Sequence, residues 1–278
     1  MSVTTIARHP VPRTSAGFGG AFRSEWTKIR SVRSTYWSLA AGIIFSIGFG
    51  VLSCGIVAHH YQKYSGAELQ RQLMRDNFDP VSQAMSGVIL GQLAVAVLGV
   101  LVVSSEYRNR MIRTTLTALP RRGRMLLAKV AVFGALAVVV GEITTFASFF
   151  IGMRLFDSQS LSVSLGDSGV LRAVAGTGLY LALAGILGLG LGLIIRHSAG
   201  AITAIIGCLL VVPILATAIP QPWQDRIGQM LPFSIGEQAS SIRDLGGHLS
   251  PAVGLLFFAI YGAIAIAIGA WLLQRRDA

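Results

Sequence analysis

The stretch that decides the class of fold lies at residues 173–195 and reads AVAGTGLYLALAGILGLGLGLII. It contains 23 consecutive residues without Asp, Glu, Lys or Arg. A helix needs about 20 apolar residues to cross roughly 30 Å of hydrocarbon, so the stretch is long enough to span a membrane. Its residues do not alternate between apolar and polar with a period of two, which argues against a strand of a membrane barrel.

Five further stretches of the same kind lie on either side of this one. Trimmed to their apolar residues, the six predict helical spans near residues 37–58, 84–103, 126–151, 171–195, 199–219 and 252–273. We therefore predict an all-α integral membrane protein with six transmembrane helices in one domain, residues 21–276. Residues 1–20, rich in Ser, Thr, Pro and Gly, are predicted to form a disordered tail.

The composition of the whole chain supports a membrane protein. Hydrophobic residues make up 53% of the 278 residues, charged residues 13%, and the mean hydropathy is +0.65. A soluble globular protein carries about 25% charged residues, so this chain lacks the polar surface of one.

The net charge of +11 has two possible explanations, nucleic-acid binding or membrane topology. With the N-terminus inside, the inner segments hold 16 of the 23 Lys and Arg residues and three acids, whereas the outer segments hold seven cations and eight acids. This excess is the positive-inside pattern. We therefore expect both termini in the cytoplasm, a multi-pass protein of the bacterial cell membrane, and no nucleic-acid partner.

The first basic segment, residues 21–36, precedes the first span and predicts an amphipathic helix. Its apolar stripe can lie in the lipid interface while its basic residues meet anionic headgroups. Such a helix can be a membrane anchor, a docking surface for a cytoplasmic partner, or both. The residues that we assign to this interfacial helix are Phe22, Glu25, Trp26, Lys28, Ile29 and Arg30, and Tyr36 continues the stripe.

The second basic segment, residues 106–124, contains six arginines and one acid between the second and third spans. A short helix is predicted there, ended by Pro120. Its candidate interaction residues are Glu106, Tyr107, Arg108, Arg110, Met111, Arg113 and Thr114.

The outer segment, residues 220–250, is too short and too polar to span a membrane. Trp223, Ile227, Met230 and Leu231 recur at helical spacing, which predicts reentrant-like helices at the outer leaflet. A structural cap and a gate remain equal alternatives for them.

Two features within the spans are candidates for special roles. Glu142 is the one acidic residue that lies well inside a predicted span. Intramembrane carboxylates often act as proton relays or substrate contacts. A structural role is favoured here, because no second carboxylate, His or Lys lies within another predicted span to act as a relay partner. Gly185, Gly188 and Gly192 share one helix face and predict a close helix contact.

The chain shows no pattern of an enzyme. It contains no Gly-Lys dipeptide and hence no P-loop, no Ser/His/Asp arrangement at catalytic spacing, and no metal-ligand cluster. We expect it to have no catalytic residues and no bound metal or cofactor.

Two motifs resemble the bacterial, especially actinobacterial, permease subunits of ABC transporters of the ABC-2 type. They are SEWTKIRSVRSTYW at residues 24–37 and SEYRNRMIRTTL at residues 105–116, the latter followed by PRRGR and a span. RHSAG at residues 196–200 is also similar. Asn109 and Arg110 depart from the family, where many members have Gly with a small residue.

The resemblance implies a transport subunit that lacks its own motor. A separate cytoplasmic subunit would bind ATP and Mg²⁺, and a second permease subunit, identical or different, would complete the pathway. It also implies that residues 106–124 form the coupling helix, that the interfacial helix borders the same contact, and that the outer segment holds gate helices.

The expected function is export of a lipophilic or amphipathic substrate such as a drug, a peptide or a lipid-like molecule. The alternative is a membrane sensor or scaffold that passes a signal to a partner without transport. A secondary transporter is disfavoured because paired intramembrane charges and discontinuous repeats are not apparent.

Overall fold

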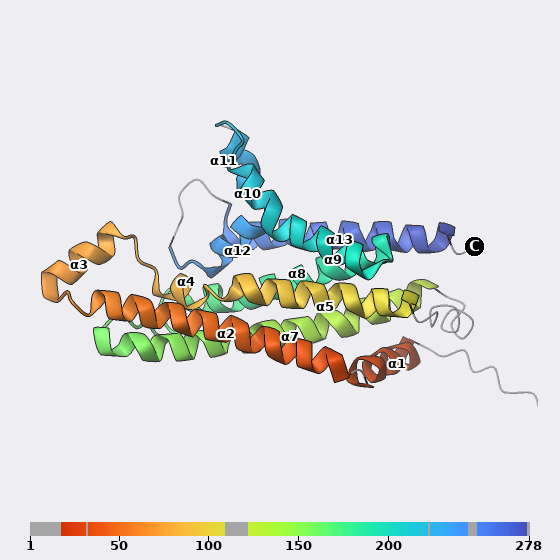
Figure 1. The fold of residues 1–278 in the computed structure, drawn as a ribbon, viewed down its shortest axis with the longest axis horizontal. Helices are drawn as coiled ribbons and strands as arrows, with labels where there is room; N and C mark the ends of the chain where they lie inside the picture. The colour runs from red at the N-terminus through yellow and green to blue at the C-terminus, as the bar shows by residue number, and fades with distance from the viewer. Residues whose placement is uncertain (1–17, 32, 109–121, 222, 244–248, 277–278) are drawn as a thin grey trace, which may run out of the picture.

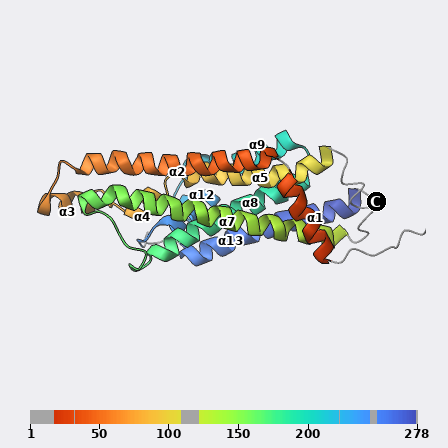
Figure 2. The same cartoon turned by 90° about the horizontal axis from the view of Figure 1, so that it is seen from below.

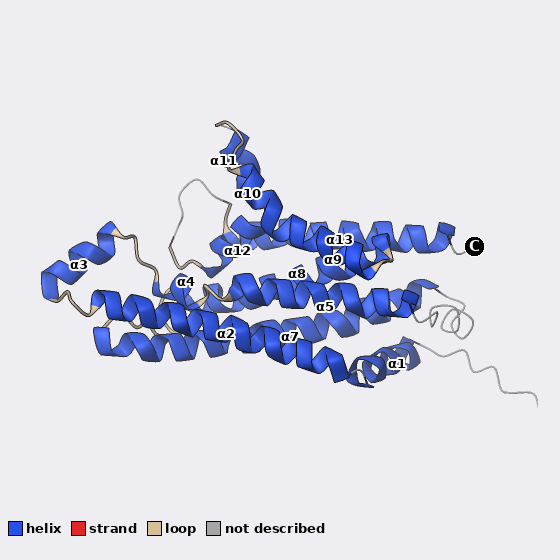
Figure 3. Cartoon of the chain, viewed as in Figure 1, coloured by secondary structure: helices blue, strands red, loops and turns tan. Residues whose placement is uncertain are grey.

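The computed structural model describes residues 18–31, 33–108, 122–221, 223–243 and 249–276. Every regular element in these ranges is a helix (Figure 3). The predicted all-α class is therefore confirmed for the described part of the chain.

Six of the described helices are long and apolar enough to cross a membrane. Five are α2 (Arg33–Tyr61), α5 (Val88–Arg108), α7 (Arg122–Phe156), α8 (Val170–Ile195) and α13 (Pro251–Arg276). The sixth is a composite in which α9 (Ser198–Ile206) continues through a π-helical turn (Gly207–Val211) into α10 (Val212–Ala216). Each overlaps one predicted span, so the chain has the architecture of a multi-pass membrane protein.

Some predicted boundaries were wrong. The second span starts at Val88 rather than residue 84, because Pro80–Ala84 form a separate short helix, α4, which Asp79 caps by accepting bonds from the backbone N–H groups of Val81 and Ser82. The third helix ends at Phe156, beyond the predicted residue 151, and the fifth span ends at Ala216 rather than residue 219.

The two ends of the chain's helical part lie together. α1 (Phe18–Ser31) and the C-terminal end of α13 lie at the same end of the bundle, which we call the basal end (Figures 1 and 2). The opposite, distal end carries α3 (Gly66–Arg75) and the connection from α7 through a short 3₁₀ turn (Asp157–Gln159) to α8. An even number of spans accounts for this arrangement.

The predicted N-terminal helix differs in its bounds. α1 begins at Phe18, inside the predicted tail, and ends at Ser31, so Tyr36 belongs to α2 rather than to the stripe of α1. The stripe predicted for the outer segment is also divided, because α11 (Trp223–Gly228) and α12 (Pro232–Ser240) are separate helices and Pro232 begins the second.

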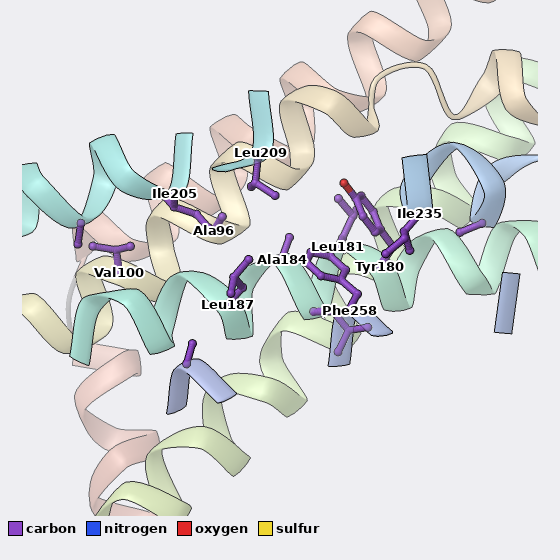
Figure 4. Close-up of a cluster of buried hydrophobic side chains, with 14 residues drawn as sticks. Ala96, Val100, Tyr180, Leu181, Ala184, Leu187, Ile205, Leu209, Ile235 and Phe258 are labelled. Carbon is purple, nitrogen blue, oxygen red and sulfur yellow. The ribbon is translucent and has the colours of Figure 1, made fainter. Parts of the chain in front are cut away.

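The central element is α8, which packs against α5, α7 and α13. We compared the share of buried residues in the most apolar 18-residue stretch of each of the six spans. This share is largest in α8, at 67%, and smallest in α2, at 17%. The largest core cluster is built around it (Figure 4) and includes Tyr180, Leu181, Ala184 and Leu187 of α8 with Ala96, Val100, Ile205, Leu209, Ile235 and Phe258 of its neighbours.

The predicted glycine contact is confirmed and lies within the chain. Gly188 faces the backbone of Ala96, and Gly192 faces that of Val100, both on α5. Gly185 faces the side chains of Val95 and Phe133. Small residues let two helices approach closely where lipid supplies no hydrophobic drive for association.

Candidate functional site

A buried ion pair joins α1 to α7 at the basal end. Lys129 Nζ lies 2.5 Å from Glu25 Oε2, and the two side chains are only 3% and 4% exposed. Glu25 thus faces the protein, while Phe22 and Trp26 on the same helix are 40% and 47% exposed. The face of α1 that packs on α7 therefore carries the charged side chain of Glu25, whereas Phe22 and Trp26 of the predicted apolar stripe are exposed.

The predicted coupling segment falls largely outside the described residues. Arg110, Met111, Arg113 and Thr114 lie in the undescribed range 109–121, and the side chains of Glu106 and Arg108 are also outside the description. So are those of Lys28 and Ile29 in α1. Glu25, Trp26, Phe22, Arg30 and Tyr107 are the described members of the two predicted sets.

Tyr107 takes part in a second set of contacts at the basal end. The guanidinium carbon of Arg196 lies 5.1 Å from the centre of the Tyr107 ring, a distance typical of a cation–π contact. An Arg196 Nη2–H donates to the carbonyl of Leu272, 3.3 Å away. Arg196 ends α8 in a left-handed conformation, with φ of 61°, so the turn after α8 connects the end of α5 to the end of α13.

Glu142 lies against the neighbouring helix α8. It is partly exposed in the middle of α7, and its carboxyl group lies against Gly178 of α8, where an added Cβ would stand 2.7 Å from the carboxyl carbon. The hydroxyl groups of Thr144 and Thr145 donate to backbone carbonyls of their own helix, those of Val140 and Gly141. Glu142 thus packs against α8, and its structural role stays a prediction.

At the distal end, a polar network connects α4 to the segment after α12. Asp79 Oδ2 accepts from the Ser241 hydroxyl at 3.0 Å and from the Ile242 backbone N–H at 2.9 Å. Arg172, at the start of α8, donates to the Ser241 carbonyl at 2.9 Å, and Arg243 donates to Asn77 Oδ1. The chain after α12 is therefore fixed to two separate elements.

The predicted outer helices have different environments. α12 packs on α8 and α13, and its residues Ile235, Gly236 and Ala239 are buried. α11 instead exposes Trp223 and Ile227, at 60% and 42%. Only α12 is integrated into the core.

An open cavity of about 450 Å³ lies between the fifth span and α11–α12. Its lining includes Leu209, Leu210 and Pro213 from the fifth span and Phe233, Ser234 and Glu237 from α12. Its size is within the range of small-molecule sites, roughly 300–1,000 Å³.

Sequence reasoning missed three of these features. Glu25 and Lys129 are 104 positions apart, and no local pattern pairs them. The cavity depends on a π-helical turn that has no clear sequence signal. The α4 cap did have a signal, because Asp79 followed by Pro80 is a favourable N-cap and first helical residue.

No protein-family model matches the chain, and no curated protein matches it. Within the described ranges, no group of three His, Cys, Asp or Glu side chains could hold a metal ion.

A buried hydrogen bond across the core provides a first prediction. Tyr180 donates its hydroxyl hydrogen to Gln92 Oε1, and both residues are buried. Tyr180→Phe removes the donor and leaves the Gln92 acceptor in the core, so it should lower the free energy of unfolding by about 1–3 kcal/mol, measured by denaturation in detergent. The control is Tyr261→Phe, whose hydroxyl donates to Met230 in an exposed setting. Equal losses for the two variants would contradict the prediction.

Proposed function

We propose that the chain is the transmembrane permease subunit of an ATP-driven exporter, powered by a separate cytoplasmic ATP-binding subunit. In this proposal the basal end faces the cytoplasm, the distal end faces outward, and the membrane is the bacterial cell membrane. The exported molecule is lipophilic or amphipathic, because the spans carry little charge. ATP and Mg²⁺ bind to the partner subunit.

The observation that carries the proposal is the buried Glu25–Lys129 pair. Lys129 lies seven positions after α7 begins at Arg122, directly beyond the basic segment that resembles a coupling helix. A load applied to that segment by a partner would therefore act on α1 and α7 together. Packed helices respond to such a load by switching between discrete arrangements, which is how closure of two ATPases could open the pathway.

The second basal contact supports the same role from the other side of the segment. Tyr107 lies at the end of α5, just before the undescribed range, and contacts Arg196. Arg196 is in turn bonded to the end of α13. Both ends of the basic segment are thus anchored to the membrane helices.

The exposed helices leave room for a second permease subunit. In the most apolar stretches of α2 and of the fifth span, only 17% and 22% of the residues are buried. The outer faces of these two spans therefore contact lipid, another subunit, or both. Phe22 and Trp26 of α1 are also exposed, which suits an interfacial helix whose apolar side chains enter the headgroup region.

The proposal is tested by isolating the ATP-binding subunit that co-purifies with the chain and reconstituting the two proteins together in liposomes. We expect ATP-dependent movement of an amphipathic fluorescent substrate and stimulation of ATP hydrolysis. Met111→Asp in the basic segment should reduce the stimulation at least about tenfold, as loss of an interface hot spot does. The matched control is Met74→Asp at the distal end, where Met74 is 79% exposed.

Three outcomes would count against the proposal. Equal stimulation by the Met111→Asp and Met74→Asp variants would contradict the coupling segment. Stimulated hydrolysis without flux of any candidate would favour a sensor. Neither stimulation nor flux would contradict the whole proposal.

The orientation has its own test by cysteine labelling. In a Cys208→Ser background, in which the remaining Cys54 is fully buried, Ser65→Cys and Gly123→Cys each add one exposed thiol. A membrane-impermeant maleimide added to intact cells should label Ser65→Cys and should label Gly123→Cys only after permeabilisation. The reverse pattern would overturn the orientation.

A further inference from the structure

The cavity beside the fifth span is formed by a distortion of that span. α9 widens into a π-helical turn at Gly207–Val211, and α10 follows with Pro213 as its second residue. π-Helical turns are rare and are frequent at functional sites, and proline contributes no backbone N–H to the helix. Leu209, Leu210 and Pro213, which line the cavity, all belong to this distorted region.

The opposite wall is supplied by the outer helices. It is lined by Leu231, Phe233, Ser234 and Glu237, which belong to α12 and to the residue before it. α12 is held in place by its buried face on α8, where Gly236 packs directly against the Tyr180 ring. The cavity therefore has one irregular wall within a membrane span and one wall fixed to the core.

The polar groups of the lining are few. Apart from the apolar side chains, the described lining contains Thr217, Gln229, Ser234 and Glu237 and no Lys or Arg. Three of the four come from the segment 229–237, and Thr217 follows the end of α10. A ligand that fits this lining has an apolar body and a head that donates hydrogen bonds or carries positive charge.

We propose that this cavity binds a single-chain amphiphile with an amine-bearing head. The apolar chain lies along Leu209, Leu210 and Pro213, and the head lies beside Ser234 and Glu237. As an assignment of the exported substrate class this inference rests on the proposed function, whereas binding itself needs neither ATP nor a partner.

The occupant follows from the shape and charge of the site. The cavity is of ligand size rather than a flat face, so it does not require a helix of a second subunit to fill it. The lining is acidic where it is charged, which favours an ammonium head over a carboxylate. Such a molecule is already dissolved in the membrane and can enter the cavity from the side.

The test uses the full-length chain alone, purified into nanodiscs of neutral lipid. The probe is a dodecylamine that carries a photoreactive diazirine in its chain, and the labelled peptides are identified by mass spectrometry. We expect labels on the segments 209–217 and 228–237, removed by excess unmodified dodecylamine. The dodecanoate analogue should label these segments about tenfold less, the factor that one charge-assisted hydrogen bond accounts for.

Two variants and one control separate the cavity from ordinary lipid contact. Leu210→Trp fills the cavity and should abolish its labelling, whereas Leu215→Trp lies on the same span, is 63% exposed and does not line the cavity, so labelling should persist. Glu237→Gln should reduce the preference for the amine about tenfold. Correct folding of each variant is checked by its elution profile and thermal unfolding, and Ile214→Trp replaces Leu210→Trp if the latter does not fold.

The outcomes that overturn the inference are distinct from failure of the proposed function. Labelling that survives the folded cavity-filling variant would show lipid contact only. Equal labelling by amine and carboxylate would overturn the head-group assignment. Transport in liposomes without cavity labelling would leave the exporter proposal intact, and labelling without ATP-dependent flux would contradict the exporter but not the site.

Discussion

Lys129→Met is expected to be among the most damaging single substitutions in the chain. It leaves the Glu25 carboxylate buried, at 3% exposure, without the ammonium that lies 2.5 Å away. Breaking a buried ion pair from one side costs about 3–5 kcal/mol, because a charge remains in a medium that solvates it poorly. Because α1 contacts mainly α7, we expect α1 of this variant to detach from α7 before the rest of the bundle unfolds.

The measurement combines stability with the position of α1. Denaturation in mixed micelles gives the free energy of unfolding, and limited proteolysis reports release of α1 as a cleavage near Ser31. The control is Arg23→Met, which removes an exposed cation from α1 and should change neither readout.

The double variant Glu25→Leu/Lys129→Met discriminates between a broken pair and a lost packing contact. Replacing both partners by apolar residues of similar size is often neutral or stabilising, so this variant should recover most of the lost stability. If the pair also transmits the load from the partner ATPase, the double variant should be stable yet poorly stimulated. A Lys129→Met protein as stable as the wild type, with α1 still protected, would contradict the role of the pair.

The positions of the spans could be predicted from the sequence because their physical requirement is local. A helix in lipid must satisfy its own backbone and present apolar side chains over a fixed thickness, and residues 173–195 meet that requirement by themselves. The predicted second span began too early because residues 84–87 are apolar enough to extend it. Asp79 and Pro80 instead begin a separate short helix, α4, and the apolar composition of the segment does not show where that helix begins.

The contacts that define the candidate site are not local. The Glu25–Lys129 pair needs α1 to turn one particular face toward α7, and the amphipathic pattern of α1 indicated a different face. The cavity needs the π-helical turn at Gly207–Val211, which adds a residue to one turn without changing the hydropathy of the span. Both features depend on how the helices pack. Periodicity in the sequence therefore predicts where the helices lie along the chain but not which residues they bring into contact.

Gly188→Ala is the second substitution from which we expect a large effect, because it acts where the backbones of α5 and α8 approach each other closely in the core. A Cβ at Gly188 would overlap the carbonyl oxygen of Ala96, and its next neighbours are the carbonyl carbon and Cα of that same residue, at 2.9 and 3.1 Å. Backbone atoms cannot rotate away as a flexible side chain can. The two helices must therefore separate, which disturbs the contacts of Val100 and Leu187 in the same cluster.

The expected loss for Gly188→Ala exceeds the about 1–3 kcal/mol typical of an overpacked core, because rigid backbone is displaced. The steric cost must also outweigh the intrinsic helix preference for alanine over glycine, which is about 1 kcal/mol. The matched controls are Gly48→Ala and Gly55→Ala in α2, where an added Cβ meets no atom within 4 Å. These should be neutral or slightly stabilising in thermal unfolding followed by circular dichroism. If Gly188→Ala unfolds at the same temperature as the two controls, α5 and α8 are not in backbone contact, and the central position of α8 in the bundle is wrong.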